Sequence, residues 1–213
     1  MRIIDLSKPL IPGQNCECTV PDNLPVYMGL ACEEYRYAFR SHVGCYFETA
    51  AHLYRGGTMT GDVPIEQLIG PAVVARLDPA KSGAIEPDEI RPKLQPGDVL
   101  LVDAGKNTNR FFSRAFGRWL AENKVRLLGA TLPLYDTGFT NPTGVFIELF
   151  QADIPIIAEL QNVDQITHER IVLIVLPLAV ENVCTVPARV VALDGEENEI
   201  QSLLDLLHVQ PEN

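Results

Sequence analysis

The chain has 213 residues, of which 46% are hydrophobic, so it can bury a core and fits a single domain. Its 28 acidic residues outnumber its 17 basic ones, and the formal net charge is −11. Nucleic acids and anionic membranes bind basic patches, so this balance argues against both partners and favours a small molecule or another protein. The five cysteines are odd in number and the N-terminus lacks a signal-peptide apolar core, which predicts the reducing cytoplasm.

Short apolar runs rich in β-branched residues recur between Gly, Pro and Asp, a pattern typical of strands. In chain order they are residues 3–6, 72–77, 99–102, 125–128, 154–157, 171–176 and 188–193. The proline-rich stretch from Pro9 to Pro25 suppresses regular structure and is expected to form a loop that borders a pocket. Acidic residues and a proline in 86–90 predict a short helix start.

Two helices are expected in the second half of the chain. In residues 113–122, Phe116, Trp119 and Leu120 recur at helical spacing, which predicts an amphipathic helix that buries these three side chains. The acidic segment 196–213 with its Leu203, Leu206 and Leu207 stripe predicts a peripheral helical tail beyond a single domain of residues 1–195. His168 is expected to face solvent.

The stretch from Ser41 to His52 carries two histidines and a glutamate, His42, Glu48 and His52, at even spacings. On an extended strand all three side chains would point the same way. Two imidazoles and a carboxylate together suit a zinc-, manganese- or iron-type ion, and either group can act as a general base near neutral pH. The solvent face of an ordinary strand has the same spacing, so both interpretations stay open at this point.

The same stretch resembles the signature of the cyclase family of metal-dependent hydrolases, which includes bacterial kynurenine formamidase and isatin hydrolase and reads His-x-Gly-Thr-His-x-Asp-x-Pro-x-His. His42, Gly44 and His52 match this signature, whereas Glu48 replaces its Asp and Tyr46 replaces its middle His. Further segments resemble the family in the same order, namely residues 2–7, 64–72, 96–101, 176–178 and 187–193. The resemblance spans residues 1–195, one whole domain.

The resemblance implies an α/β fold with a mixed, strongly curved, barrel-like sheet and helices packed outside. In the family, a His and a Glu twelve residues apart complete the metal site, and these positions fall on Ile147 and Glu159. The implied ligands are therefore His42, Glu48 and Glu159, with two family ligands lost at Tyr46 and Ile147. This set suits one divalent ion, zinc or manganese, better than a two-metal site, and a metal-free state is the alternative.

Three further residues of the signature have two interpretations each. The resemblance implies that His52 moves protons as a general acid and base, whereas the alternative is a buried His bonded to a backbone carbonyl. Tyr46 would donate a hydrogen bond to a substrate carbonyl as a catalytic residue, or fill the volume of the missing imidazole. Cys45 is either a thiolate ligand or nucleophile, or a small buried hydrophobic residue.

The chain has two candidate functions, which belong to different classes of protein. The first is a hydrolase that opens a small amide or lactone-type bond, similar to an arylformamidase, and the second is a metal-free relative that serves small-molecule binding or assembly. The relatives associate, so a homo-oligomer is expected, most simply a two-fold dimer. The loop from Pro9 to Pro25 is expected to reach across the interface and help cover the neighbouring pocket.

Overall fold

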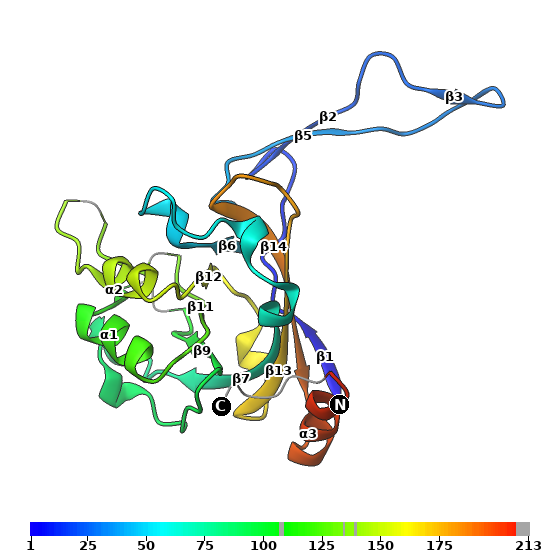
Figure 1. Ribbon diagram of the computed structural model, residues 1–213. Helices are drawn as coiled ribbons and strands as arrows, with labels where there is room; N and C mark the ends of the chain where they lie inside the picture. The colour runs from blue at the N-terminus through cyan, green and yellow to red at the C-terminus, as the bar shows by residue number, and fades with distance from the viewer. Residues whose placement is uncertain (107–108, 134, 139, 208–213) are drawn as a thin grey trace.

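A computed structural model describes residues 1–106, 109–133, 135–138 and 140–207 (Figure 1). Within these residues, eight strands form one mixed sheet, and β6 pairs with both β12 and β14, so that the sheet closes into a barrel with β1 added outside β14. In sheet order the strands are β1 (Arg2–Asp5), β14 (Thr185–Asp194), β13 (Arg170–Pro177), β7 (Ile69–Arg76), β9 (Val99–Asp103), β11 (Leu127–Ala130), β12 (Ile156–Ala158) and β6 (Tyr46–Glu48). The predicted α/β fold with a curved, barrel-like sheet is confirmed.

The seven pairings that close the barrel comprise three parallel and four antiparallel ones. β7, β9, β11 and β12 run parallel, whereas β6, β14 and β13 pair antiparallel with their neighbours. All seven strands predicted from apolar runs are present, although the strand expected at 125–128 begins at Leu127 and that at 154–157 begins at Ile156. Central strands buried on both faces give strong sequence signals, which explains this agreement.

Side chains alternate between two cores along the barrel strands. In β9, Val99 and Leu101 join the cluster that fills the barrel, while Leu100 and Val102 join the cluster between the barrel and the helices. In β6, Phe47 points inward, so Tyr46 and Glu48 point outward. The outer face of β6 is therefore the surface that can carry polar chemistry.

Helices α1 (Arg114–Glu122) and α2 (Val145–Gln151) cover one side of the sheet (Figure 1). α1 begins at Ser113, whose hydroxyl accepts a hydrogen bond from the Phe116 N–H at 3.0 Å. Phe116 and Leu120 are fully buried and Trp119 is partly buried against them, as predicted. A short 3-10 helix, η4 (Pro87–Glu89), lies where a helix start was expected. The remaining short helices are η1 (Ala50–His52), η2 (Thr60–Asp62), η3 (Ile65–Leu68) and η5 (Val163–Gln165), and β8 (Gly83–Ile85) pairs with β10 (Arg110–Phe112).

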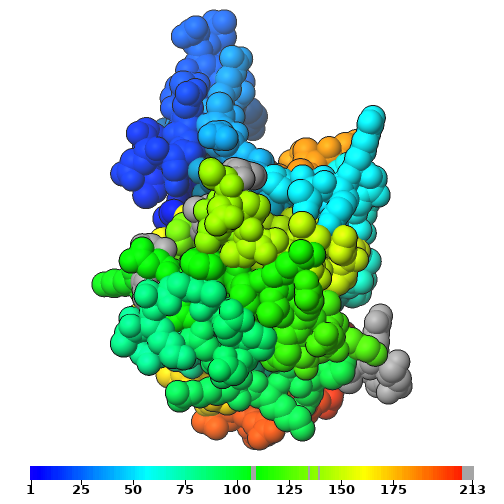
Figure 2. Space-filling model, turned by 90° about the vertical axis from the view of Figure 1, so that its left-hand side faces the viewer, coloured from blue at the N-terminus to red at the C-terminus, as the bar shows by residue number. Residues whose placement is uncertain are grey.

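Residues 16–39 form an arm that projects from the body at the end where β6 and β14 lie (Figures 1 and 2). The prediction of a loop from Pro9 to Pro25 is wrong in part, because β2 (Glu17–Thr19) pairs with β5 (Arg36–Ala38). Farther out, β3 (Val26–Tyr27) pairs with β4 (Leu30–Ala31). These strands were missed because they are very short and carry no apolar alternation.

Helix α3 (Glu197–Leu206) follows β14 and forms the expected peripheral helix. It buries Ile200, whereas Leu206 is 77% exposed, so the predicted leucine stripe is not the buried face. The rest of the predicted tail, 208–213, lies outside the described residues. None of the helices in the described part of the chain combines the length and hydrophobicity of a membrane span.

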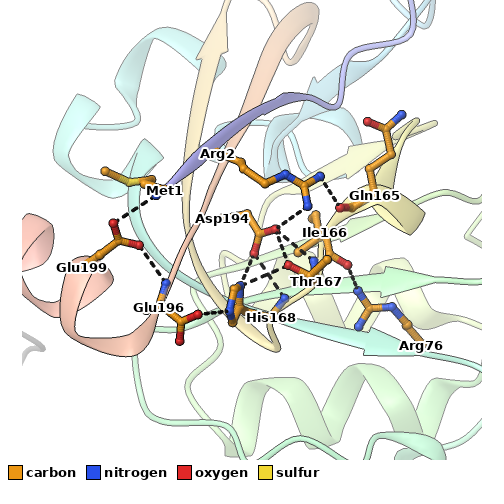
Figure 3. Close-up of polar contacts among 10 residues, drawn as sticks. All are labelled: Met1, Arg2, Arg76, Gln165, Ile166, Thr167, His168, Asp194, Glu196 and Glu199. Carbon is orange, nitrogen blue, oxygen red and sulfur yellow. Dashed lines mark hydrogen bonds and ion pairs between the residues drawn. The ribbon is translucent and has the colours of Figure 1, made fainter.

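A buried carboxylate, Asp194, ties the end of β14 to the loop before β13 (Figure 3). It accepts hydrogen bonds from the backbone N–H and hydroxyl of Thr167 (3.0 and 2.9 Å) and from the N–H and Nδ1 of His168 (3.2 and 2.7 Å). His168 is partly exposed, as expected, but its ring also holds Asp194 in place. Burial opposes ionisation of Asp194, but these donors outweigh it and hold its pKa at about 2.

This network predicts an acid-sensitive contribution to stability. The pKa of Asp194 lies below its usual 3.8, so the stabilisation is complete above that value and is lost as the pH falls toward 2. The shift corresponds to about 2 kcal/mol of unfolding free energy. Urea unfolding at about pH 5 and about pH 2 should show this loss, and Asp194→Asn should reduce the difference by that amount. An unchanged pH dependence in the variant would contradict the role of Asp194.

Candidate metal and active site

His42, Glu48 and His52 converge, and one potential ligand atom from each lies within 4.8 Å of the others. His42 Nε2 is 2.6 Å and His52 Nδ1 is 3.7 Å from Glu48 Oε2. The rings of His42 and His52 cross edge to face with their centroids 5.0 Å apart. The expected convergence of these three residues is thus present in the structure.

The local backbone that brings them together differs from the expected extended strand. Only 46–48 form a strand, and His42 precedes it while His52 ends η1. Gly44 adopts a positive φ of 66°, and a Cβ at this position would lie 2.8 Å from the Lys8 carbonyl oxygen. The turn at Gly44 therefore needs glycine both for its conformation and for this close approach. The turn and η1, rather than strand alternation, place both histidines beside Glu48.

Burial governs the electrostatics of the group. Glu48 is 3% exposed, and desolvation raises its pKa, although the nearby His52 and a hydrogen bond from Thr185 oppose this change. The pKa of His42 is lowered, first by desolvation and then by the charge of Arg40. Both changes favour the uncharged forms of this pair. Ser41 Oγ lies 3.0 Å from His42 Nδ1, which orients the ring so that Nε2 faces Glu48.

Tyr46 and Cys45 are both buried. Tyr46 is buried, its ring packs edge to face on His42 at 5.0 Å, and burial raises its pKa above the ordinary value. Its hydrogen bond to a substrate stays a prediction. Cys45 is 1% exposed, and burial raises its pKa to about 12, so it is a neutral buried thiol.

Glu159, expected as a third ligand, is not part of the three-residue group. It follows β12, which pairs with β6, but its carboxylate binds the ammonium group of Lys8. Both residues line a hollow with Asp103, Lys106 and Thr131. Its role as a metal ligand stays a prediction, and any such role would require the ion pair with Lys8 to open. Ile147 lies in α2 and supplies no ligand atom.

Thr185 and Cys184, at the start of β14, complete the surroundings of Glu48 and were missed from the sequence. The Thr185 hydroxyl donates to Glu48 Oε2 at 3.3 Å. Cys184 Sγ lies 3.8 Å from His52 Nδ1. The pairing of β14 with β6 brings them there across more than 130 residues of sequence.

The donor chemistry of the group fits a divalent metal ion. Two imidazoles and a buried carboxylate are typical zinc or manganese ligands, and a cation would offset the desolvation cost of the Glu48 charge. Binding of an ion would require His42 Nε2 and Glu48 Oε2 to move apart. At 2.6 Å they are closer to each other than two ligand atoms of one ion. The residues present therefore supply three ligands and leave coordination positions for further groups.

Comparison with known proteins gives one family and several similar folds. The sequence profile of the cyclase family matches residues 4–137. Isatin hydrolase A from Labrenzia aggregata, bound to benzyl benzoate, is 19% identical with a TM-score of 0.74 over 92% of this chain and 94% of its own. A protein described as a predicted metal-dependent hydrolase, from Bacillus stearothermophilus, is 22% identical with a TM-score of 0.73 over 91% of this chain and 98% of its own. The chain has no significant match among curated protein sequences.

Proposed function

Because this chain belongs to the cyclase family, we propose that it is a metal-dependent hydrolase that opens a small amide or lactone-type bond, similar to an arylformamidase. The observation that carries the proposal is the convergence of His42, Glu48 and His52 on one point. Similar folds bear the names isatin hydrolase and metal-dependent hydrolase, which supports the same class of reaction. We propose zinc or manganese as the ion.

The chemistry divides between the ion and the residues around it. A divalent ion at this site would supply a Lewis acid for a carbonyl group and lower the pKa of water. Glu48, which is buried and accepts a hydrogen bond from Thr185, would supply the negative charge for such an ion. Tyr46 packs on His42 and limits the movement of its ring. His52 is partly exposed, so it can also meet substrate from the solvent side.

A metal-free relative is the second candidate function, and two contacts favour it. His42 and Glu48 already satisfy each other at 2.6 Å, and Glu159 is already neutralised by Lys8. Both pairs would stabilise the fold without an ion. Assays of aryl formamides, lactams and lactones with zinc- or manganese-loaded protein separate the two functions. Hydrolysis that disappears in His42→Ala supports the enzyme, and no turnover of any substrate supports the metal-free alternative.

The variants His42→Ala and His52→Ala test which histidine binds the metal and which one only transfers protons. The approach of His52 Nδ1 to Glu48 supports a ligand role, so both variants are expected to lose metal affinity. If His52 acts only in proton transfer, as predicted from the sequence, its variant will retain the ion while turnover falls by about 100-fold or more. Equilibrium dialysis against zinc and steady-state kinetics distinguish these outcomes. Retained metal in His42→Ala would contradict the site itself.

We further propose that the protein is a two-fold dimer in which the arm of each copy packs on the other. A two-stranded ribbon is at best marginally stable in water, yet the arm exposes Val26, Tyr27, Met28 and Leu30 by 67–86%. At its base an apolar hollow of about 730 Å³, lined by Leu10, Phe39 and Leu176 among others, provides matching surface. These apolar areas are typical of an interface between copies.

We propose that the protein is located in the cytoplasm. All five cysteines are free thiols, and none is paired in a disulfide. Free thiols persist in a reducing compartment.

A further inference from the structure

The position of Cys184 is fixed directly beside the His42, Glu48 and His52 group. Its carbonyl oxygen accepts hydrogen bonds from the Thr49 N–H at 2.9 Å and from the Thr49 hydroxyl at 3.2 Å. Thr49 follows Glu48 in the chain, so these bonds attach the start of β14 to the turn between β6 and η1. The backbone of Cys184 is therefore held by the same segment that positions Glu48.

The side chain of Cys184 points toward the group. Its Sγ lies 3.8 Å from His52 Nδ1. The Thr185 hydroxyl contacts both Cys184 Sγ, at 3.7 Å, and Glu48 Oε2, at 3.3 Å. The Cys184 thiol therefore contacts both His52 and the hydroxyl group that bonds to Glu48.

We propose that Cys184 is the fourth ligand of the metal site and makes it selective for zinc-type ions. This inference rests on the proposed function, because it requires an ion held by His42, Glu48 and His52. Two nitrogens, one oxygen and one sulfur are donors that suit zinc, which can expand to five ligands and so still take water or substrate. Thiolate is a soft ligand that favours zinc and cobalt over manganese or magnesium.

The distance between Cys184 Sγ and His52 supports shared coordination. The sulfur lies outside the group of His42, Glu48 and His52 whose ligand atoms are all within 4.8 Å of one another, so it would have to move toward His42 and Glu48 when an ion binds. With zinc–sulfur and zinc–nitrogen bonds of about 2.3 and 2.0 Å, two ligands at a tetrahedral angle have atoms about 3.5 Å apart. The observed 3.8 Å between Cys184 Sγ and His52 Nδ1 requires a change of only a few tenths of an ångström by this estimate. The 3.7 Å between His52 Nδ1 and Glu48 Oε2 is similarly close.

A catalytic cysteine is the main alternative, and the geometry argues against it. In a nucleophile–histidine–acid arrangement the nucleophile and the acid contact opposite nitrogens of the imidazole. Here Cys184 Sγ and Glu48 Oε2 both approach the same atom, Nδ1 of His52. Two groups that converge on one ring nitrogen are arranged as ligands that surround a point, not as a proton relay.

Cobalt titration of the full-length protein tests the proposal. Co²⁺ bound by protein ligands gives visible d–d absorption, and thiolate ligation adds a sulfur-to-cobalt charge-transfer band in the near ultraviolet. Wild type is expected to show both, and Cys184→Ser to keep the visible bands without the charge-transfer band. Cys32→Ser, which removes a thiol on the arm, is the matched control and should match wild type. Zinc affinity of Cys184→Ser should fall by at least about 10-fold, with manganese affinity little changed.

The outcomes separate this inference from the proposed function. Visible cobalt bands without a charge-transfer band in wild type would overturn the role of Cys184 and leave the metal site intact. The same would follow if Cys184→Ser kept the charge-transfer band. An absence of all cobalt bands would overturn both the ligand and the proposed metal-dependent function.

Discussion

Glu48→Gln is expected to lose metal binding and hydrolysis together, each by roughly 100-fold or more, since loss of even an outer-shell partner commonly costs 10- to 100-fold. Glu48 is the central member of the group, because it contacts His42 at 2.6 Å and His52 at 3.7 Å. Glutamine keeps the size of the side chain but removes the charge. Isothermal titration with zinc and steady-state kinetics measure the two losses.

The melting temperature of Glu48→Gln distinguishes the loss of a metal ligand from misfolding of the variant. Burial raises the pKa of Glu48, so ionised Glu48 is costly in the metal-free protein, and the neutral amide should not lower the melting temperature. Thr185→Val is the matched control, since it removes only the hydroxyl that supports Glu48. It should weaken metal binding by about 10-fold. Full metal affinity in Glu48→Gln would show that the ion, if bound, lies elsewhere.

Removal of the outer arm is expected to convert the dimer to a monomer. Replacement of residues 20–35 by a short Asn-Gly turn would join β2 to β5 directly and delete the exposed Val26, Tyr27, Met28 and Leu30. The barrel should fold unchanged, because none of these four side chains belongs to either core cluster. Light scattering at micromolar concentration measures the mass, and circular dichroism confirms the fold.

Two controls make the arm prediction specific. Tyr27→Ser with Met28→Ser keeps the full arm length but removes apolar area at the tip, and it should weaken the dimer without abolishing it. Leu206→Ser removes another exposed apolar side chain, on α3, and should leave the mass unchanged. A wild-type monomer at micromolar concentration, or a dimer that survives the deletion, would refute the role of the arm.

The barrel was predictable because its strands carry dense local signals. Residues 99–103 are buried at every position and consist mainly of Val and Leu, a composition that predicts a central strand. α1 was equally clear, because Ser113 caps it and Phe116 and Leu120 follow at helical spacing. In such segments local preference and tertiary packing agree.

The candidate site was predictable only in part, because its contacts depend on the closure of the barrel. The spacing of His42, Glu48 and His52 indicated a shared surface, although a turn and a 3-10 helix bring them together instead of a strand. Cys184 could not be found in this way, since it reaches His52 only through the pairing of β14 with β6. The ion pair between Lys8 and Glu159 likewise joins distant segments.

The metal content of protein purified without a histidine tag or chelator tests the central claim most directly. Elemental analysis after zinc reconstitution and gel filtration should find close to one zinc ion per wild-type chain and almost none in Glu48→Gln. A wild-type protein that remains free of metal after reconstitution with zinc and with manganese would contradict the metal-dependent hydrolase.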